Sequence, residues 1–328
     1  MSRYARAVVQ ELRRHASRLA RRSPFWGRVL LPLAVAYRAM RGEPQPANPD
    51  PVTRSNLPDE LVRVAANLRA RRIDGFLVDE AWVRRQDARI AAAMSHFLRA
   101  SDFCKETPSE AIAEYVAEYR RLYAGAPIAQ NNYGMNFPGG LALFVITRCL
   151  NPKVVIESGV YRGLSSYLLA KAVPMARIAA FDPNLDDVQY RTPGVTYHPC
   201  DWMQVEIAGD GGGLAFFDDH QSQARRVIEA HGRGFRHLVF DDSWPLETII
   251  GCGYPPIPSI DMVMESIAIG ERLTWVEGKK LCTYVHTAPM YELCAKARGL
   301  IKSVYDVPGL YRETGIAPSS ALKIVELI

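Results

Sequence analysis

The chain has 328 residues, 48% of them hydrophobic and 23% charged, so it can form one large domain or two smaller ones, and its composition excludes a disordered or fibrous protein. The net charge of +5 is uneven, because ten arginines in residues 1–50 face only Glu11, Glu43 and Asp50. Residues 1–50 therefore carry a net charge of +7, which leaves a net charge of −2 on residues 51–328. A nearly neutral body argues against a nucleic-acid-binding groove.

Residues 1–50 are expected to form a basic arm that ends in a linker. The apolar stretch Arg28–Tyr37 is too short to span a bilayer, which needs about 20 apolar residues. No cleavage site follows the long arginine-rich lead, which argues against a secretion signal. Two roles remain: a basic helix on an anionic membrane surface, or a helical extension packed on the body, which is favoured. The four prolines in residues 42–51 predict the linker.

The six cysteines have neither metal-type nor disulfide-type spacing. Most are therefore expected to be small buried hydrophobic residues in a reducing compartment. We expect a cytoplasmic protein whose only membrane contact, if the arm makes one, is peripheral.

Residues 51–130 are predicted to be helical. Apolar residues recur at helical spacing around Leu61 and Leu68, and Ser109 with Glu110 is an N-terminal signal for a helix that closes at Gly125. No chemistry is apparent in this region.

Residues 131–328 alternate between short apolar strands and helices. Strands are predicted at 153–159, 176–182, 195–201, 214–219 and 237–242, and helices at 164–173 and 223–232. The fold class is therefore α/β: a doubly wound, Rossmann-like, mostly parallel sheet with helices on both faces, preceded by the N-terminal helical extension. Residues 321–327 are predicted to be a last strand at the sheet edge. In such sheets ligands bind beyond the carboxyl ends of the strands.

A glycine-containing turn follows the first strand. Gly159 and Gly163 let the backbone approach a ligand, and the following helix presents free N–H groups, although a tight turn without a ligand would use the same residues. Asp182 ends the second strand, where a carboxylate can accept hydrogen bonds from ribose hydroxyls. Asp201 ends the third strand; it suits an adenine amino group but is also a common turn residue.

These motifs resemble those of class I S-adenosylmethionine-dependent methyltransferases. Ile156–Gly163 looks like their glycine motif, with Glu157 closing the first strand, and Ala180–Asp182 looks like their ribose-binding motif. The resemblance covers about residues 152–244. It implies S-adenosylmethionine as cofactor and the following cofactor-binding residues: Glu157, Gly159, Gly163, Ser165 for the methionine carboxylate, Asp182 and Asp201.

Two further strands end in adjacent aspartates, Asp218–Asp219 before His220, and Asp241–Asp242. Both resemble the strand ends of metal-dependent O-methyltransferases that act on catechols and macrolide sugars. The resemblance implies that Mg2+ is held by Asp218, Asp241 and Asp242, with Asp219 as the other candidate for the first ligand.

The chemistry of these side chains agrees with that implication. Mg2+ prefers carboxylate oxygens, and a histidine titrates near working pH, so His220 and Asp219 are the predicted catalytic residues. Plain structural roles are the alternative: Asp218 and Asp219 as caps of the next helix, Asp241 and Asp242 as a solvated turn, and His220 as a surface residue.

The predicted function is the Mg2+-assisted transfer of a methyl group from S-adenosylmethionine to a hydroxyl of a sugar, glycan or small natural product. The expected partner is this small-molecule or glycan acceptor, without nucleic acid; a homo-oligomer remains open. One alternative is a nicotinamide-dependent oxidoreductase or epimerase, which would need a closer G-x-G-x-x-G and a catalytic Tyr-x-x-x-Lys pair. The other is a non-catalytic binding protein with the same fold.

Overall fold

The computed structural model describes residues 58–59, 62–63, 77, 79–102, 104–128, 131, 133–245, 248, 255–277 and 280–328, although it leaves the side chains of 276, 277 and 280 undescribed. These residues belong to one compact unit that begins at Pro58. The predicted basic arm and linker lie outside the described residues. Within the described part, no helix has both the length and the apolar character to cross a bilayer.

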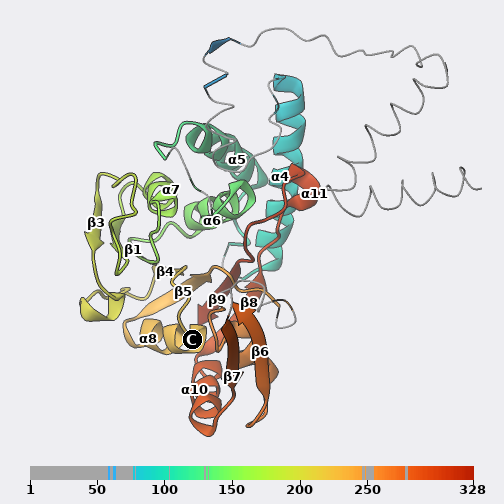
Figure 1. Cartoon of the computed structure of the whole chain (residues 1–328). Coiled ribbons are helices and arrows are strands. Elements are labelled where there is room, and N and C mark those ends of the chain that lie inside the picture. Colours follow the sequence, from blue (N-terminus) through green and yellow to red (C-terminus); the bar gives the residue numbers. More distant parts are fainter. Residues whose placement is uncertain are drawn as a thin grey trace, which may run out of the picture. The chain divides into compact units, whose positions relative to one another are not determined.

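The described residues contain a seven-stranded sheet with the order β3-β2-β1-β4-β5-β9-β8 (Figure 1). Its strands are β1 (Val154–Ser158), β2 (Arg177–Phe181), β3 (Val195–His198), β4 (Gly213–Phe217), β5 (Phe235–Phe240), β8 (Ile301–Asp306) and β9 (Lys323–Leu327). The first five are parallel, and β9 runs antiparallel to both of its neighbours. The predicted mostly parallel, Rossmann-like sheet is confirmed.

The prediction of an edge strand at 321–327 was wrong. β9 lies between β5 and β8, and its residues Lys323, Ile324, Val325 and Leu327 are buried, as expected of an interior strand. The edge is β8, which the sequence did not predict. None of its residues is fully buried, and its polar side chains leave no continuous apolar run.

Helices cover both faces of the sheet because neighbouring strand residues point to opposite sides. In β1, Val155 packs on one face with α6 (Phe137–Leu150) and α7 (Leu164–Ala172). Val154 and Ile156 pack on the other face with α8 (Gln223–Gly232), α9 (Ile260–Glu265) and α10 (Ala288–Arg298). Figure 1 shows the sheet between these two groups of helices.

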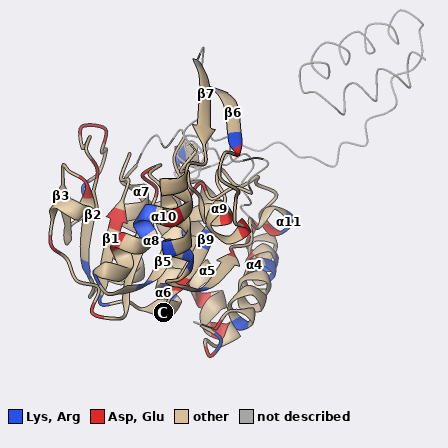
Figure 2. Ribbon diagram, turned by 90° about the horizontal axis from the view of Figure 1, so that it is seen from below, with Lys and Arg blue, Asp and Glu red and all other residues tan. Residues whose placement is uncertain are grey.

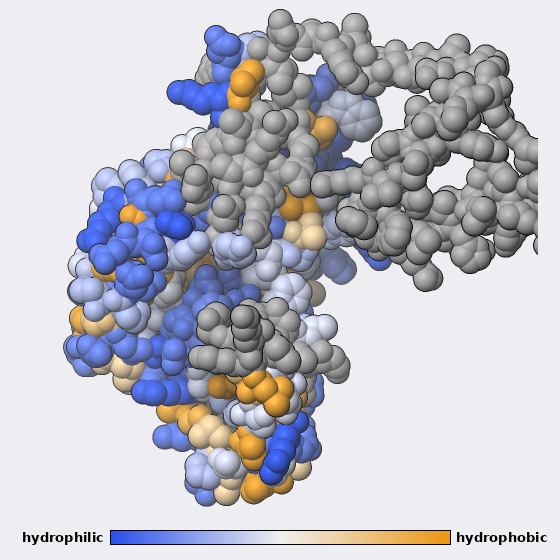
Figure 3. Space-filling view, in the orientation of Figure 1, coloured by the Kyte–Doolittle hydropathy of each residue, from blue (hydrophilic) through white to orange (hydrophobic). Residues whose placement is uncertain are grey.

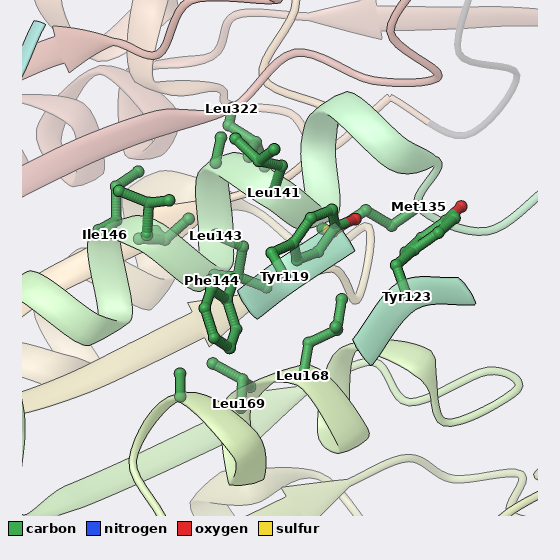
Figure 4. Packing of buried hydrophobic residues seen from close by; sticks show 14 of the residues in the cluster. Tyr119, Tyr123, Met135, Leu141, Leu143, Phe144, Ile146, Leu168, Leu169 and Leu322 are labelled. Atoms are coloured by element: carbon green, nitrogen blue, oxygen red, sulfur yellow. The ribbon is translucent and has the colours of Figure 1, made fainter. Parts of the chain in front are cut away.

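The helices predicted between residues 51 and 130 include α4 (Glu80–Ala100) and α5 (Ser109–Ala124), which add to the first of these cores. Tyr119 of α5 is fully buried and donates a hydrogen bond of 2.9 Å to the carbonyl of Phe137 at the start of α6. Figure 4 shows Tyr119 and Tyr123 beside Met135 and the leucines of α6 and α7. The core thus supports the segment that leads into α6.

A separate two-stranded hairpin lies between α9 and α10 in the chain. Its strands β6 (Arg272–Glu277) and β7 (Lys280–Val285) pair only with each other among the described residues. Figure 2 shows the hairpin projecting from the rest of the fold. After it, the short α11 (Tyr311–Thr314) packs on α4 before the chain enters β9.

The strand order reverses between β1 and β4. From β1 the chain proceeds to β2 and β3 on one side, and then to β4 and β5 on the other. In open α/β sheets the crevice at such a reversal, beyond the carboxyl ends of the strands, is the usual ligand site. This is where the predicted glycine turn and the two aspartate pairs lie.

Candidate functional site: an acidic cavity at the strand ends

A cavity of about 980 Å³ opens at this point of the sheet. Four loops that follow β1, β2, β4 and β5 contribute to it, together with the segments before α6 and before β9. Its described lining residues are Tyr133, Gly134, Met135, Gly159, Tyr161, Asp182, Pro183, Asn184, Asp187, Asp218, Asp219, His220, Asp241, Asp242, Trp244, Thr248, Ser319 and Ser320. The volume is sufficient for a drug-sized ligand.

The cavity is strongly acidic. Its described lining contains six aspartates and one histidine but no lysine or arginine. The sequence also has no lysine or arginine between Asp241 and Tyr254. Figure 3 shows hydrophilic surface in the middle of this face, where β4 and β5 lie in Figure 1. A ligand with positive charge is therefore the electrostatic complement of this cavity.

Gly159 directly follows β1 and lies against the backbone of Asp218 at the end of β4. Its φ of +98° is unfavourable for other residues, and an added Cβ would lie 2.2 Å from the carbonyl oxygen of Asp218. Gly163, with a φ of +91°, precedes α7, where a Cβ would lie 2.6 Å from the carbonyl oxygen of Tyr190. Gly159 lines the cavity whereas Gly163 does not. Both glycines are thus required by the fold itself.

Asp182 lines the cavity and also holds the turn after β1. Its Oδ2 accepts hydrogen bonds from the backbone N–H groups of Val160 and Tyr161 at 2.9 and 3.2 Å. Its Oδ1 accepts one from Asn184 N–H at 2.8 Å. A carboxylate has about four acceptor positions, so one remains for a ligand hydroxyl.

Glu157 and Ser165, both predicted to bind cofactor, lie behind the cavity wall instead of lining it. Glu157 is fully buried; Ser166 of α7 donates a hydrogen bond to its Oε2, and its Oε1 has no partner among the described residues. Burial raises the pKa of Glu157 to about 7, against the lowering effect of hydrogen bonds from Ser165 and Ser166. The two serines therefore anchor α7 to the end of β1.

We expect the Glu157→Gln variant to lose less stability than the wild type between pH 5 and 7.5. A folded carboxyl with a raised pKa holds its proton more tightly than the unfolded chain does, so wild-type stability falls as the pH rises from about 4.5 to 7. A shift of this size corresponds to about 3 kcal/mol. Urea unfolding at several pH values measures the difference. The exposed Glu265→Gln variant is the control, and parallel profiles for Glu157→Gln and wild type would contradict the expectation.

Asp201 is held in an ion-pair network and does not line the cavity. The buried Arg226 of α8 lies 2.6 Å from Asp201 Oδ2, 2.7 Å from Asp219 Oδ2 and 2.7 Å from Glu229 Oε2. Burial would raise the pKa of Asp201, but the hydrogen bonds from Arg226 and from the Met203 N–H hold it below its usual value. The Asp201 carboxylate, predicted to contact adenine, is thus already paired with Arg226.

Asp219, predicted to be catalytic, is engaged by the same arginine. Its Oδ2 also accepts a hydrogen bond from Ser158 Oγ at 2.6 Å, and its Oδ1 accepts one from Gln221 N–H at 3.0 Å. With these donors, most of the acceptor positions of the Asp219 carboxylate are already occupied. Asp219 therefore joins the ends of β1 and β4 to α8, which favours Asp218 over Asp219 as the metal ligand.

Asp218, His220 and Asp242 come together at the ends of β4 and β5. Each offers one ligand atom, and these atoms all lie within 4.8 Å of one another. Burial, together with the charges of Asp241 and Asp242, raises the pKa of Asp218 well above its usual value. Burial also raises the pKa of Asp242, although nearby His220 opposes this effect. This cluster of carboxylates is costly without a cation.

Asp241, the third predicted ligand, lies next to this group but is more deeply placed. It is 4% exposed, and its Oδ1 accepts a hydrogen bond of 2.8 Å from the Asp242 N–H. Burial and the charge of Asp242 raise the pKa of Asp241 to about 7. Gln223 of α8 donates a hydrogen bond of 3.3 Å to its carbonyl oxygen and so fixes this turn.

Four cavity residues other than glycine have left-handed backbone conformations. Their φ angles are 69° at Tyr133, 48° at Tyr161, 53° at His220 and 50° at Asp242. Such conformations are uncommon and tend to gather at functional sites. Their gathering at one cavity supports a functional role for it.

The sequence did not single out Arg226 or the cavity aromatics Tyr161 and Trp244. A signal for Arg226 was present: it shares the buried face of α8 with Gln223, Val227 and Ala230 at helical spacing. A charged residue on such a face needs a buried partner. For Tyr161 and Trp244 no comparable signal exists, since each lies in a loop.

The Tyr-x-x-x-Lys spacing that the oxidoreductase alternative requires does occur, at Tyr167 and Lys171 of α7. These residues line a second hollow of about 240 Å³ with the segment before β3, and neither lines the acidic cavity. Lys171 Nζ lies over the Tyr167 ring, 5.7 Å from its centroid. The pair is thus separate from the site at the strand ends.

No protein-family model and no curated protein matches the chain. The similar solved structures include the O-methyltransferase TomG from Streptomyces achromogenes with SAM, which is 14% identical with a TM-score of 0.36 and covers 77% of this chain and 99% of that one. An O-methyltransferase from Bacillus cereus with SAH is 11% identical with a TM-score of 0.33 and covers 73% and 99%.

A structure described as cmcI-N160 with SAH is 15% identical with a TM-score of 0.29 and covers 33% of this chain. The chain spans 61% of that protein's length, and 63% of the length of the CmcI-N160 apo-structure. Identities and TM-scores this low do not transfer an activity or a substrate to the present chain.

Proposed function

We propose that the chain is an S-adenosylmethionine-dependent O-methyltransferase that methylates a hydroxyl of a sugar, glycan or small natural product with the help of a divalent cation. The observation that carries this proposal is a cavity with six aspartates and no lysine or arginine in its described lining, at the reversal point of the sheet. The sulfonium of the methyl donor and a divalent ion are both cations, so both complement the cavity.

The same charge argues against the oxidoreductase alternative. A dinucleotide brings a pyrophosphate, which dinucleotide-binding folds place on backbone N–H groups at a glycine-rich turn. Here the first turn already donates the N–H groups of Val160 and Tyr161 to Asp182, and further carboxylates line the opposite side. A pyrophosphate would meet these charges, and no described lining residue is a lysine or arginine; Arg162 lies outside the lining, over the ring of Tyr161.

The donor site would lie over the ends of β1 and β2. Asp182 has one acceptor position left for a ribose hydroxyl, and Gly159 leaves the backbone open where a side chain would intrude. Tyr161 lies at the same wall and offers an aromatic ring to a cationic or aromatic group.

The acceptor side would lie over the ends of β4 and β5. Asp218 and Asp242 would hold the divalent ion, predicted from the sequence as Mg2+, and Asp241 would support the turn that carries Asp242. A bound ion supplies Lewis acidity, lowering the pKa of the acceptor hydroxyl and orienting its oxygen. His220 can serve there as the base or as a ligand of the ion.

We expect the full-length protein to bind S-adenosylhomocysteine, measured by titration calorimetry. The Asp182→Asn variant should bind it at least about tenfold more weakly, because the remaining acceptor on Asp182 loses its charge. Asp210→Asn, on the exposed loop before β4, is the matched control and should bind as the wild type does. Urea unfolding of both variants shows whether the turn held by Asp182 persists. The absence of binding at millimolar ligand would contradict the proposed function.

A further inference from the structure

The group Asp218, His220 and Asp242 is a mixed set of nitrogen and oxygen donors, whereas the sequence predicted three carboxylates. His220 Nδ1 lies 3.4 Å from Asp242 Oδ2. Two ligand atoms that each lie about 2.1 Å from one ion are at most about 4.2 Å apart. The histidine and Asp242 are therefore already near enough to share an ion, and His220 needs no large movement to become a ligand.

The surroundings of this group leave its charge uncompensated. The carboxylates of Asp241, Asp242, Asp219 and Glu157 surround that of Asp218, and Arg226 is already shared among Asp201, Asp219 and Glu229. Ser320 lines the same cavity and is 8% exposed; its hydroxyl lies close enough to the Asp241 carboxylate to lower the pKa of Asp241, but its Oγ makes no hydrogen bond of regular geometry among the described residues. A buried hydroxyl whose hydrogen bonding is incomplete in this way leaves room for a polar ligand in this cavity.

We propose that Asp218, His220 and Asp242 bind a first-row transition ion of the Zn2+ and Co2+ class, with the His220 imidazole as a ligand. An imidazole nitrogen suits these borderline ions, whereas Mg2+ selects oxygen ligands and dehydrates reluctantly. Asp241 then acts as a positioning residue, since its Oδ1 holds the Asp242 N–H. The ion's task beside an acceptor hydroxyl rests on the proposed function, but its binding can be measured without donor or acceptor.

The test compares Zn2+, Co2+ and Mg2+ on full-length protein that has been treated with a chelator and dialysed. Calorimetry gives the three affinities, and the visible absorption of Co2+ reports its ligands. We expect one ion per chain, with Zn2+ and Co2+ bound at least about 100-fold more tightly than Mg2+. In His220→Asn this preference should fall by at least about tenfold, with Mg2+ affinity changed less than about threefold, because the amide replaces a good nitrogen ligand.

The decisive quantity is the difference between wild type and His220→Asn in their preference for Zn2+ and Co2+ over Mg2+. Transition ions bind more tightly than Mg2+ even at sites made only of oxygen ligands, so the wild-type preference alone does not identify a histidine ligand. His96→Asn, on the exposed side of α4, is the control for adventitious histidine binding and should keep the wild-type preference. An unchanged preference in His220→Asn, or no ion bound to the wild type, would overturn the proposal. S-adenosylhomocysteine binding on the same samples reports the proposed function separately, so that either result can fail alone.

Discussion

The Asp218→Asn variant should lose the proposed methyl transfer by about 100-fold or more while remaining at least as stable as the wild type. Asn keeps the shape of the side chain but removes the charge that attracts the cation. Four neighbouring carboxylates, at Asp241, Asp242, Asp219 and Glu157, repel that charge in the folded protein, so its removal does not destabilise the fold. Activity against a hydroxyl acceptor and the thermal unfolding midpoint at pH 8 measure the two effects.

A loss of activity without a loss of stability in Asp218→Asn would show that the charge of Asp218 serves function and not the fold. Asp210→Asn, which changes an exposed loop residue in the same way, should leave both quantities unchanged. If Asp218→Asn kept its activity within about threefold, the charge of Asp218 would not be needed for catalysis. If instead it unfolded, Asp218 would be a structural residue.

The largest effect on stability is expected for Arg226→Met, which should lower the free energy of unfolding by about 3–5 kcal/mol. The side chain of Arg226 is 3% exposed and pairs with three carboxylates; its removal leaves the largely buried Asp219 and the partly exposed Asp201 without this cation, while Glu229 keeps Arg225. Because lower pH protonates these carboxyls, part of the loss should be recovered below pH 5. Urea unfolding at pH 4 and 7 measures both values.

The neighbouring Arg225→Met variant is the matched control. Arg225 is 65% exposed and, among the residues that the structure describes, forms an ion pair with Glu229 one turn away, an arrangement that contributes less than about 1 kcal/mol. The two arginines thus differ in burial but not in helix or in residue type. Equal losses in the two variants would mean that the ion-pair network adds little to the fold.

The strands β1, β2, β4 and β5 were predictable because each contains a short apolar run that ends at a glycine, an acid or a turn, and β3 because its Val, Thr and Tyr favour a strand. β8 was not predictable, because Lys302, Ser303 and Asp306 interrupt its apolar residues. An edge strand is covered on one side only and needs fewer apolar side chains. Without β8, the sequence placed β9 at the edge.

The acidic residues of the site were predictable because their position at the strand ends is local in sequence. The role of each acidic residue, as metal ligand, cofactor ligand or structural residue, was not predictable, because it depends on side chains that other helices and strands bring close to it. Asp219 is taken up by Arg226 of α8, and Ser165 belongs to the side of α7 that holds Glu157. Both outcomes depend on how a helix is rotated against the sheet, which a period of 3.6 residues fixes only roughly.

The hairpin of β6 and β7 has a practical consequence for protein engineering. The chain enters and leaves it at neighbouring points, since Gly270 N–H donates to the carbonyl of His286 and His286 N–H to that of Glu271, both at 2.8 Å. No strand of the seven-stranded sheet pairs with it among the described residues. The hairpin is therefore a natural site for an epitope insertion or a shortening, because either change leaves the register of the main sheet untouched.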